Sequence, residues 1–291
     1  MKKSSNTTDR LEAGGNGEIL MKTKKLVGML TAMSMALPVL CIQQTSAEDK
    51  GPMRDMTTAE IVKDMGIGIN LGNTMEACGD WILDCSSGTV RDYETAWGSP
   101  EVTKEMIQGM ADEGFGVLRI PVAWSNRMKD DGTYTIDSEL MARVTQIVDW
   151  TLETNMYAII NIHWNGGWVN NFPENKDESM KRFQVMWEQI SDNFKDYGDH
   201  LMFESQNEEF GWEKLWNPWG GTEGKAESYA LVNEINQKFV NVIRSSGGNN
   251  PERHLLISGY NTGIDRVCDP LFKMPDDPAV RMAACCFSNI E

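Results

Sequence analysis

The chain has 291 residues, with 43 acidic and 27 basic side chains and a formal net charge of −16. This acidic balance argues against a nucleic-acid partner, whose phosphates are held by clustered lysine and arginine. A neutral polymer fits the charge better, and ten tryptophans supply flat apolar faces with a polar edge.

The N-terminal region has the layout of a secretory signal peptide. Met21-Lys-Thr-Lys-Lys25 is basic, residues 26–42 are almost wholly apolar, and Thr45-Ser46-Ala47 offers small residues for cleavage. A membrane-spanning helix, the alternative, needs about 20 apolar residues and no cleavage site. The pattern therefore favours a signal peptide.

These features predict three segments. We expect residues 1–20 to be an upstream extension, with Met21 as the initiator, and residues 21–47 to be removed during secretion. Residues 48–291 would then form the folded domain. We expect this domain to be extracellular, monomeric and free of the membrane once the signal peptide is cleaved.

The cysteines and histidines do not indicate a metal site. Cys78 and Cys85 lie in one short loop and could bridge in an oxidising compartment. No cysteine pair has zinc-ligand spacing, and three histidines are too few and too scattered to form such a site. We expect no metal and no other cofactor.

Short apolar strands alternate with amphipathic helices, which predicts βα units and a parallel sheet. The expected strands are 66–72, 117–122, 157–163, 201–204, 254–258 and 280–284. The spacing of apolar residues predicts helices within 140–152, 183–194 and 231–243, and a further helix capped by Ser99 with Pro100 at its first position. A closed (β/α)8 TIM barrel uses about 250 residues and eight units. This α/β chain holds about five and a half, so we predict an incomplete TIM barrel.

Polar residues lie in or at the ends of four successive expected strands. In a barrel of this type, the functional pocket lies at the C-terminal ends of the strands. Asn70 and Asn73 end the first strand, Arg119 lies in the second, His163 and Trp164 end the third, and Asn207 and Glu208 end the fourth. Purely structural polar groups are the alternative, but four strand ends in succession favour a site. A carboxylic acid beside an amide, as in Asn207-Glu208, suits chemistry on a sugar.

Four segments carry a resemblance to a known family. They are Gly68-Ile-Asn-Leu-Gly-Asn-Thr74, Leu118-Arg-Ile-Pro-Val-Ala-Trp124, Ile162-His-Trp164 and Phe203-Glu-Ser-Gln-Asn-Glu208. In this order they resemble the strand-end motifs of glycoside hydrolase family 5, most closely its endoglucanase-type members from anaerobic fibre-degrading microbes. The resemblance runs from about Asp55 to Ala284. It implies a retaining hydrolase that uses two carboxylates about 5–5.5 Å apart.

The resemblance implies a role for each polar strand-end residue. Glu208 would be the general acid/base, which protonates the leaving oxygen and later deprotonates water. Asn207 would hydrogen-bond the sugar 2-hydroxyl, and His163 would bind other hydroxyls. Arg119 would keep the nucleophilic carboxylate ionised and oriented. Asn73 is a further substrate-binding candidate.

The surrounding residues have weaker assignments. Trp164 and Trp168 are candidate stacking platforms, and Trp212, Trp216 and Trp219 are weaker ones. We expect Glu204 to support the site through hydrogen bonds. Trp97 is expected in the core, and neither it nor Glu76 is placed in the catalytic set.

The second catalytic carboxylate has no assignment in this chain. The family's nucleophile is a glutamate at the end of the seventh strand, which is expected beyond Glu291. Where a histidine–tyrosine motif is expected on the sixth strand, the chain instead reads Ala283-Ala-Cys-Cys-Phe-Ser-Asn-Ile-Glu291. We therefore expect a C-terminally truncated domain, an Arg119 without its counter-ion, and little or no activity.

The predicted function is an endo-β-1,4-glucanase that cleaves internal bonds of cellulose or a related β-glucan, which would be its polysaccharide partner. One alternative is a hemicellulase of the same family, acting on xyloglucan, mannan or xylan. A second is an inactive remnant that still binds carbohydrate. A barrel enzyme of unrelated chemistry is disfavoured, because the chain has no phosphate-binding glycine loop or cofactor motif.

Overall fold

A computed structural model describes residues 50–163, 168–208 and 214–287. The chain divides into two units, Met1–Thr45 and Ser46–Glu291, and the second contains all the described residues. The expected upstream extension (1–20) and signal peptide (21–47) lie outside the described residues. Within the described residues, no helix is long and apolar enough to cross a membrane.

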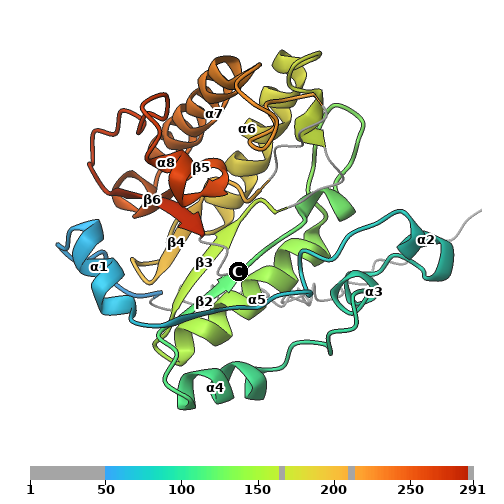
Figure 1. Ribbon diagram of the computed structural model, residues 1–291. Coiled ribbons are helices and arrows are strands. Elements are labelled where there is room, and N and C mark those ends of the chain that lie inside the picture. Colours follow the sequence, from blue (N-terminus) through green and yellow to red (C-terminus); the bar gives the residue numbers. More distant parts are fainter. Residues whose placement is uncertain (1–49, 164–167, 209–213, 288–291) are drawn as a thin grey trace, which may run out of the picture. The chain divides into compact units, whose positions relative to one another are not determined.

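Six parallel strands form one sheet in the order of the sequence, β1-β2-β3-β4-β5-β6 (Figure 1). They are β1 (Gly68–Asn70), β2 (Val117–Ile120), β3 (Tyr157–Asn161), β4 (Leu201–Glu204), β5 (Leu255–Gly263) and β6 (Met282–Phe287). All six predicted strands are present, and β5 continues five residues past its predicted end. The sheet is a half-barrel, and the predicted α/β barrel-type architecture is confirmed.

Helices alternate with the parallel strands along the chain, so the sheet is built from βα units. They are α1 (Thr58–Met65), α2 (Trp81–Cys85), α3 (Val90–Glu94), α4 (Lys104–Asp112), α5 (Ser138–Glu153), α6 (Lys176–Asn193), α7 (Lys225–Ser245) and α8 (Ile264–Val267). Short 3-10 turns cover Trp124–Arg127, Trp168–Asn171 and Asn250–Glu252.

The predicted helix start at Ser99 and Pro100 is wrong. Helix α4 begins at Lys104, and the hydroxyl of Thr103 accepts a hydrogen bond from the Met106 amide at 3.3 Å. The residues before it are held instead by a buried carboxylate, because the Val102 amide donates to Glu94 at 2.7 Å. Threonine is a good N-cap, so the chain uses the later of two capping residues.

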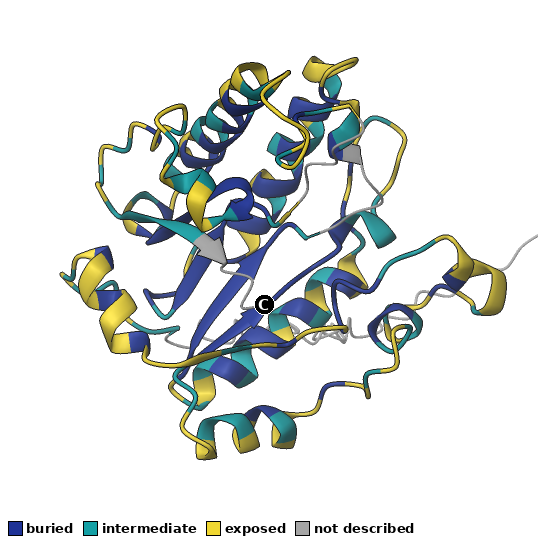
Figure 2. Ribbon diagram, viewed as in Figure 1, coloured by how far each residue is buried: buried dark blue, intermediate teal, exposed yellow. Residues whose placement is uncertain are grey.

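The apolar core lies mainly between the sheet and the long helices. Alternate strand residues such as Leu118, Ile160 and Phe203 pack with Ile147 and Trp187 from α5 and α6. Figure 2 shows β2 to β5 buried along almost their whole length and the long helices exposed on one side only. This pattern follows from the period of two in strands and 3.6 in helices.

A second, smaller apolar cluster covers the other face of the sheet. It joins Ile61 and Met65 of α1 to strand residues on that face, namely Val117, Tyr157, Ile159, Met202 and Leu256. Arg54 fixes the segment before α1, because its Nε donates to the buried Asp199 at 2.7 Å. This apolar cluster lies apart from the polar side chains Arg119 and Glu204.

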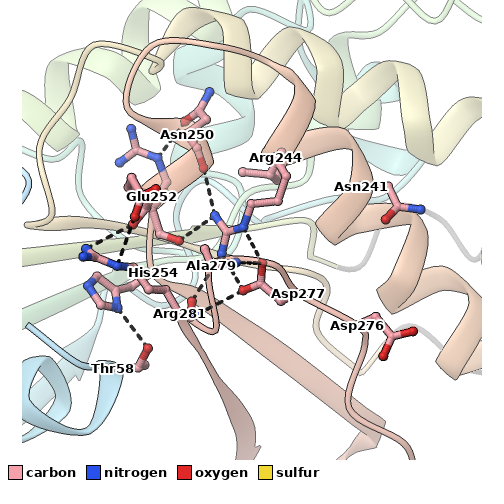
Figure 3. A network of polar contacts seen from close by, with 12 residues as sticks. Thr58, Asn241, Arg244, Asn250, Glu252, His254, Asp276, Asp277, Ala279 and Arg281 are labelled. Carbon is pink, nitrogen blue, oxygen red and sulfur yellow. Dashed lines mark hydrogen bonds and ion pairs between the residues drawn. The ribbon is translucent and has the colours of Figure 1, made fainter.

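Polar contacts hold the segment that leads into β6 (Figure 3). Arg244 donates to both carboxylate oxygens of Asp277, at 2.7 and 2.8 Å, and neither side chain is more than 8% exposed. The same carboxylate accepts the backbone amides of Ala279 and Arg281, each at 3.1 Å. Such a buried, bidentate pair fixes the start of β6 relative to α7.

Cys85 carries a thiol in this structure, with Sγ 3.4 Å from the carbonyl oxygen of Trp81. The disulfide to Cys78 that the sequence allows is therefore not formed here. The short helix α2, which ends at Cys85, is held without it.

Stability should fall in mild acid because of a buried histidine. His254 is fully buried, with Nδ1 2.9 Å from the Thr58 hydroxyl, and burial lowers its pKa to about 4 (Figure 3). An unfolded histidine titrates near 6.5, so the unfolded state binds more protons between these values. The free energy of unfolding therefore drops as pH falls from about 6.5, by at most about 1.4 kcal/mol per pH unit.

Urea denaturation between pH 6.5 and 4.5 tests this prediction. The free energy of unfolding of His254→Gln should depend less steeply on pH than that of the unsubstituted chain. Some slope should remain, because burial also lowers the pKa values of His163 and His200. An unchanged slope in the variant would show that His254 is not the group responsible.

Candidate active site

A buried ion pair lies at the centre of the polar strand ends. Arg119 on β2 donates from Nε and Nη2 to the two carboxylate oxygens of Glu204 on β4, at 2.6 and 2.7 Å. Glu204 is fully buried and Arg119 is 9% exposed. Burial alone would lower the pKa of Arg119, but the Glu204 carboxylate outweighs it and the pKa is raised.

This pair corrects the expectation that Arg119 would lack a counter-ion. The two residues lie on strands separated by β3, where Asn161 stands in register with Glu204 and donates to it at 3.4 Å. The fork of the guanidinium matches the two carboxylate oxygens, which is the geometry arginine prefers. Glu204 thus supports the site as predicted, and it does so as the counter-ion itself.

The pair orients Asn207 and, through it, His163. Arg119 Nη2 also donates to Asn207 Oδ1 at 2.9 Å. The amide nitrogen of Asn207 must then face His163, whose Nε2 lies 3.2 Å away. Since an amide nitrogen only donates, His163 Nε2 accepts and its proton is on Nδ1. Burial, with a contribution from Arg119, lowers the pKa of His163 to about 3, so the ring is neutral.

Glu208 follows Asn207 directly in the sequence and is exposed to solvent. Its position follows from the Asn207 backbone amide, which donates to the Ile162 carbonyl at 2.9 Å and continues the β3–β4 pairing. Glu208 Oε1 lies 3.5 Å from the hydroxyl of Thr262, at the end of β5. An accessible carboxylic acid next to an oriented amide can exchange a proton with a bound substrate.

Thr262 was not predicted from the sequence. Thr262 and its neighbour Asn261 have positive φ angles of 48° and 45°, which is uncommon for these residues. Strained backbone of this kind clusters at functional sites. The only sequence signal was the polar Asn-Thr pair after an apolar run, and the predicted end of that strand at Ser258 concealed it.

Asn73 lies in a tight turn after β1 and makes no described side-chain contact with the other candidates. It is exposed, has φ of 61°, and its amide donates to Glu76 at 2.5 Å. Glu76 also accepts the Thr74 amide at 2.9 Å and is 5% exposed. Glu76 therefore holds the turn that presents Asn73.

The candidate tryptophan side chains differ in their exposure to solvent. Trp164 and Trp212 lie outside the described residues, and Trp168 begins a 3-10 turn without a described side chain. Trp216 is buried, and its Nε1 donates to the Gly221 carbonyl at 2.6 Å.

Two other tryptophans are accessible. Trp219 is 69% exposed, with the Arg266 guanidinium 5.6 Å from its ring. Trp97, expected in the core, is 40% exposed because its Nε1 donates to the Cys78 carbonyl at the surface. Among the described residues, no group of three or more His, Cys, Asp or Glu side chains could hold a metal ion.

Comparison with known proteins gives the family. Residues 77–285 match the profile of Cellulase (glycosyl hydrolase family 5). The chain belongs to glycosyl hydrolase family 5. The matched segment carries Arg119, His163, Trp164, Asn207 and Glu208, so all five candidates from the second to the fourth strand lie inside it.

Characterised relatives are glucanases. The xyloglucan-specific endo-β-1,4-glucanase of Bacteroides ovatus is 35% identical over 94% of this chain and 51% of that protein. Endoglucanase B of Neocallimastix patriciarum is 38% identical over 78% of this chain and 48% of its own length. The chain spans about half the length of these family 5 relatives.

Solved structures show the same architecture. A broad specificity endoglucanase from Ruminococcus champanellensis with bound cellotriose is 33% identical, with a TM-score of 0.74 over 82% of this chain and 68% of that chain. A lichenase variant from Caldicellulosiruptor in complex with cellotetraose is 32% identical, with a TM-score of 0.72 over 82% and 65%. Both matches are to structures of carbohydrate-bound proteins that share this fold.

The Arg119–Glu204 pair should dominate the local stability. Arg119→Met leaves a buried, uncompensated carboxylate, which typically costs about 3–5 kcal/mol. Arg119→Lys should recover only part of this loss, because an ammonium cannot bind both carboxylate oxygens in the same plane. Urea denaturation at pH 7 measures both changes in the free energy of unfolding.

A surface pair provides the matched control. Arg91 and Glu101 form a 2.8 Å ion pair with both side chains exposed, so Arg91→Met should cost less than about 1 kcal/mol. Equal effects of Arg91→Met and Arg119→Met would contradict the central role of the buried pair.

Proposed function

We propose that this chain carries the acid/base half of an endo-β-1,4-glucanase site that acts by a retaining mechanism. The observation that supports this most directly is the contact chain Glu204–Arg119–Asn207–His163. The accessible Glu208 directly follows Asn207 in the sequence. Each member has a fixed donor or acceptor role, so the site is oriented before substrate binds.

In this proposal Glu208 protonates the oxygen of the glycosidic bond as it breaks, and later removes a proton from the attacking water. Asn207 hydrogen-bonds the 2-hydroxyl of the sugar at the scissile bond. His163, neutral at physiological pH, contacts other hydroxyls. Arg119 positions Asn207 through its side-chain oxygen.

The remaining candidates would extend the binding surface. Trp164 and Trp168 would stack on sugar rings, and Asn73 would contact the substrate from the turn after β1. The nucleophile is not assigned to any residue of this chain. Glu208 is the only described carboxylate that we assign to the reaction.

We also propose that residues 21–47 direct the protein out of the cell. Cellulose and related β-glucans are insoluble or very large, so an enzyme that cleaves them must meet its substrate outside. The basic, apolar and small-residue order of this segment supports the proposal. N-terminal sequencing of exported protein should begin at or near Glu48.

The substrate preference within β-glucans has two candidates. Cellulose-type chains are favoured by the endoglucanase relatives and by relatives solved with cello-oligosaccharides. Xyloglucan is favoured by the xyloglucan-specific relative from Bacteroides ovatus. Both have a β-1,4-linked glucan backbone, which the residues assigned here would contact in the same way.

Cellotriose binding tests the substrate role directly. Asn207→Ala should weaken binding roughly tenfold, equivalent to about 1.4 kcal/mol, because one or two hydrogen bonds to a buried hydroxyl are lost. Asn241→Ala, an asparagine on the exposed face of α7, is the matched control and should leave binding unchanged. Isothermal titration calorimetry measures both, and equal affinity in all three proteins would refute the assigned site.

Hydrolysis assays test the acid/base role. Retaining hydrolysis requires two carboxylates, so this chain alone should bind glucan but release no reducing sugar from mixed-linkage glucan, xyloglucan or carboxymethylcellulose. The amount of reducing sugar measured with the unsubstituted chain should equal the amount measured with Glu208→Gln. Turnover that Glu208→Gln abolishes would overturn the expected inactivity and would place both carboxylates in this chain.

A further inference from the structure

The regular pairing of β4 with β5 stops just before the candidate site. Its last bond runs from the Ser205 amide to the Leu256 carbonyl, at 3.0 Å. Continued by one residue, the register places Ser205 opposite Ile257, so a regular ladder would next run from the Ser258 amide to the Ser205 carbonyl. The Ser258 amide instead donates to the Ser205 hydroxyl at 3.2 Å, and Trp187 Nε1 donates to the Ser205 carbonyl at 3.2 Å. Side chains therefore replace the backbone pairing at this point.

Asn236 of α7 closes this contact into a ring of three hydrogen bonds. The Ser205 hydroxyl donates to Asn236 Oδ1, and Asn236 Nδ2 donates to the Ser258 carbonyl, each at 2.8 Å. The roles are fixed because a backbone amide only donates: Ser205 Oγ accepts from Ser258, and its own proton is left for Asn236. All three residues are fully buried, and each both donates and accepts within the ring. A buried polar network that is satisfied in this way is rigid.

The ring acts on the peptide unit that joins Gln206 to Asn207. The ring uses the backbone of Ser258, so the Ser258 hydroxyl is left to donate to the Gln206 carbonyl. At the other end of the same peptide unit, the Asn207 backbone amide donates to the Ile162 carbonyl at 2.9 Å. Since a peptide unit is planar, contacts at both ends fix its orientation. The Cα atom of Asn207, from which the chain continues to Glu208, is thereby held in place.

Packing alone does not explain an asparagine at this position of α7. The helix turns apolar residues such as Ile235 and Phe239 to the core, and Asn236 lies among them in its middle. Asparagine is a poor residue for a helix interior and is rarely buried. An apolar side chain would be buried without the loss of hydration that an amide suffers. What only the amide supplies is an acceptor for Ser205 and a donor for Ser258 in one planar group.

We propose that Asn236 is a positioning residue for the candidate site. Through Ser205 and Ser258 it sets the peptide unit before Asn207, and so the placement of Asn207 and Glu208 toward a bound sugar. Asn236 is fully buried and acts only through these two serines. The consequence for the sugar rests on the proposed function, whereas the orientation of the peptide unit depends only on the ring and the Ser258 hydroxyl.

Hydrogen exchange tests the orientation of the peptide unit without a ligand. Asn236→Ala opens the ring, so the Asn207 backbone amide should exchange with solvent about tenfold faster or more. Val242→Ala is the matched control, because it deletes buried methyl groups from the same helix and leaves the ring intact. It should change the exchange rate of the Asn207 amide by less than about twofold. Nuclear magnetic resonance measures the rates in the unsubstituted chain and in both variants.

Cellotriose binding, measured by calorimetry on the same proteins, tests the consequence for the site. Asn236→Ala should weaken binding about fivefold or more, because Asn207 no longer meets the sugar in a fixed geometry. Val242→Ala should bind like the unsubstituted chain, although it too is destabilised. Ser258→Ala provides both tests if Asn236→Ala does not fold. It removes only the hydroxyl that holds the Gln206 carbonyl and leaves the ring closed, and it should change exchange and binding in the same direction.

Each outcome has a distinct meaning. An unchanged exchange rate in Asn236→Ala and Ser258→Ala, or an equal acceleration by Val242→Ala, would overturn the proposal. Faster exchange with an unchanged affinity for cellotriose would also overturn it, since the peptide unit would then not determine how the site meets a sugar. Faster exchange in a protein whose unsubstituted chain does not bind cellotriose would uphold the role of Asn236 in orienting the peptide unit and refute the proposed function.

Discussion

The buried ion pair between Arg119 and Glu204 is the interaction on which the arrangement of the strand ends depends. Two charges taken out of water are stable only when their geometry is good and their other hydrogen-bonding groups are satisfied. Here both carboxylate oxygens are bound by one guanidinium, and Asn161 contacts one of them. The pair connects β2 to β4 across β3, so it links three neighbouring strands.

The same pair determines the chemical character of its neighbours. Arginine can only donate, so its contact sets the orientation of the Asn207 amide, and that amide sets the proton position on His163. The Arg119–Glu204 pair thus orients the Asn207 amide directly and the His163 ring through it, in the absence of a ligand. Preorganised donors of this kind lose little freedom when charge develops in a reaction.

The fold separates this polar region from the apolar parts of the molecule. One face of the sheet packs against the long helices, and α1 covers the other face at the N-terminal ends of the strands. The polar side chains therefore lie at the C-terminal ends of the strands. This is the arrangement in which barrel enzymes build their sites, and membership of glycosyl hydrolase family 5 is consistent with it.

Much of this could be predicted from the sequence, because strand and helix periods are local properties. The six strands and the candidates Arg119, His163 and Asn207 follow from apolar runs and the polar residues that end them. The start of α4 was missed because Ser99 and Thr103 are both good caps, and the choice depends on the distant contact of Val102 with Glu94.

The ion-pair partner of Arg119 could not be predicted from the sequence either. It lies 85 residues away, on a strand that is not its neighbour. Pairing across an intervening strand depends on side-chain length and sheet curvature, which no spacing pattern records. The contact of Thr262 with Glu208 was missed for a related reason, since β5 continues through residues with unusual backbone angles.

The most direct measurement is a crystal structure of this chain with cellotriose. The account predicts a sugar ring held by Asn207 and His163, with an oxygen of a glycosidic bond or of the chain end within about 3 Å of the Glu208 carboxyl group. It also predicts that the Arg119–Glu204 pair is unchanged by binding. Cellotriose bound away from these strand ends, or a Glu208 carboxyl turned away from the ligand, would contradict the account.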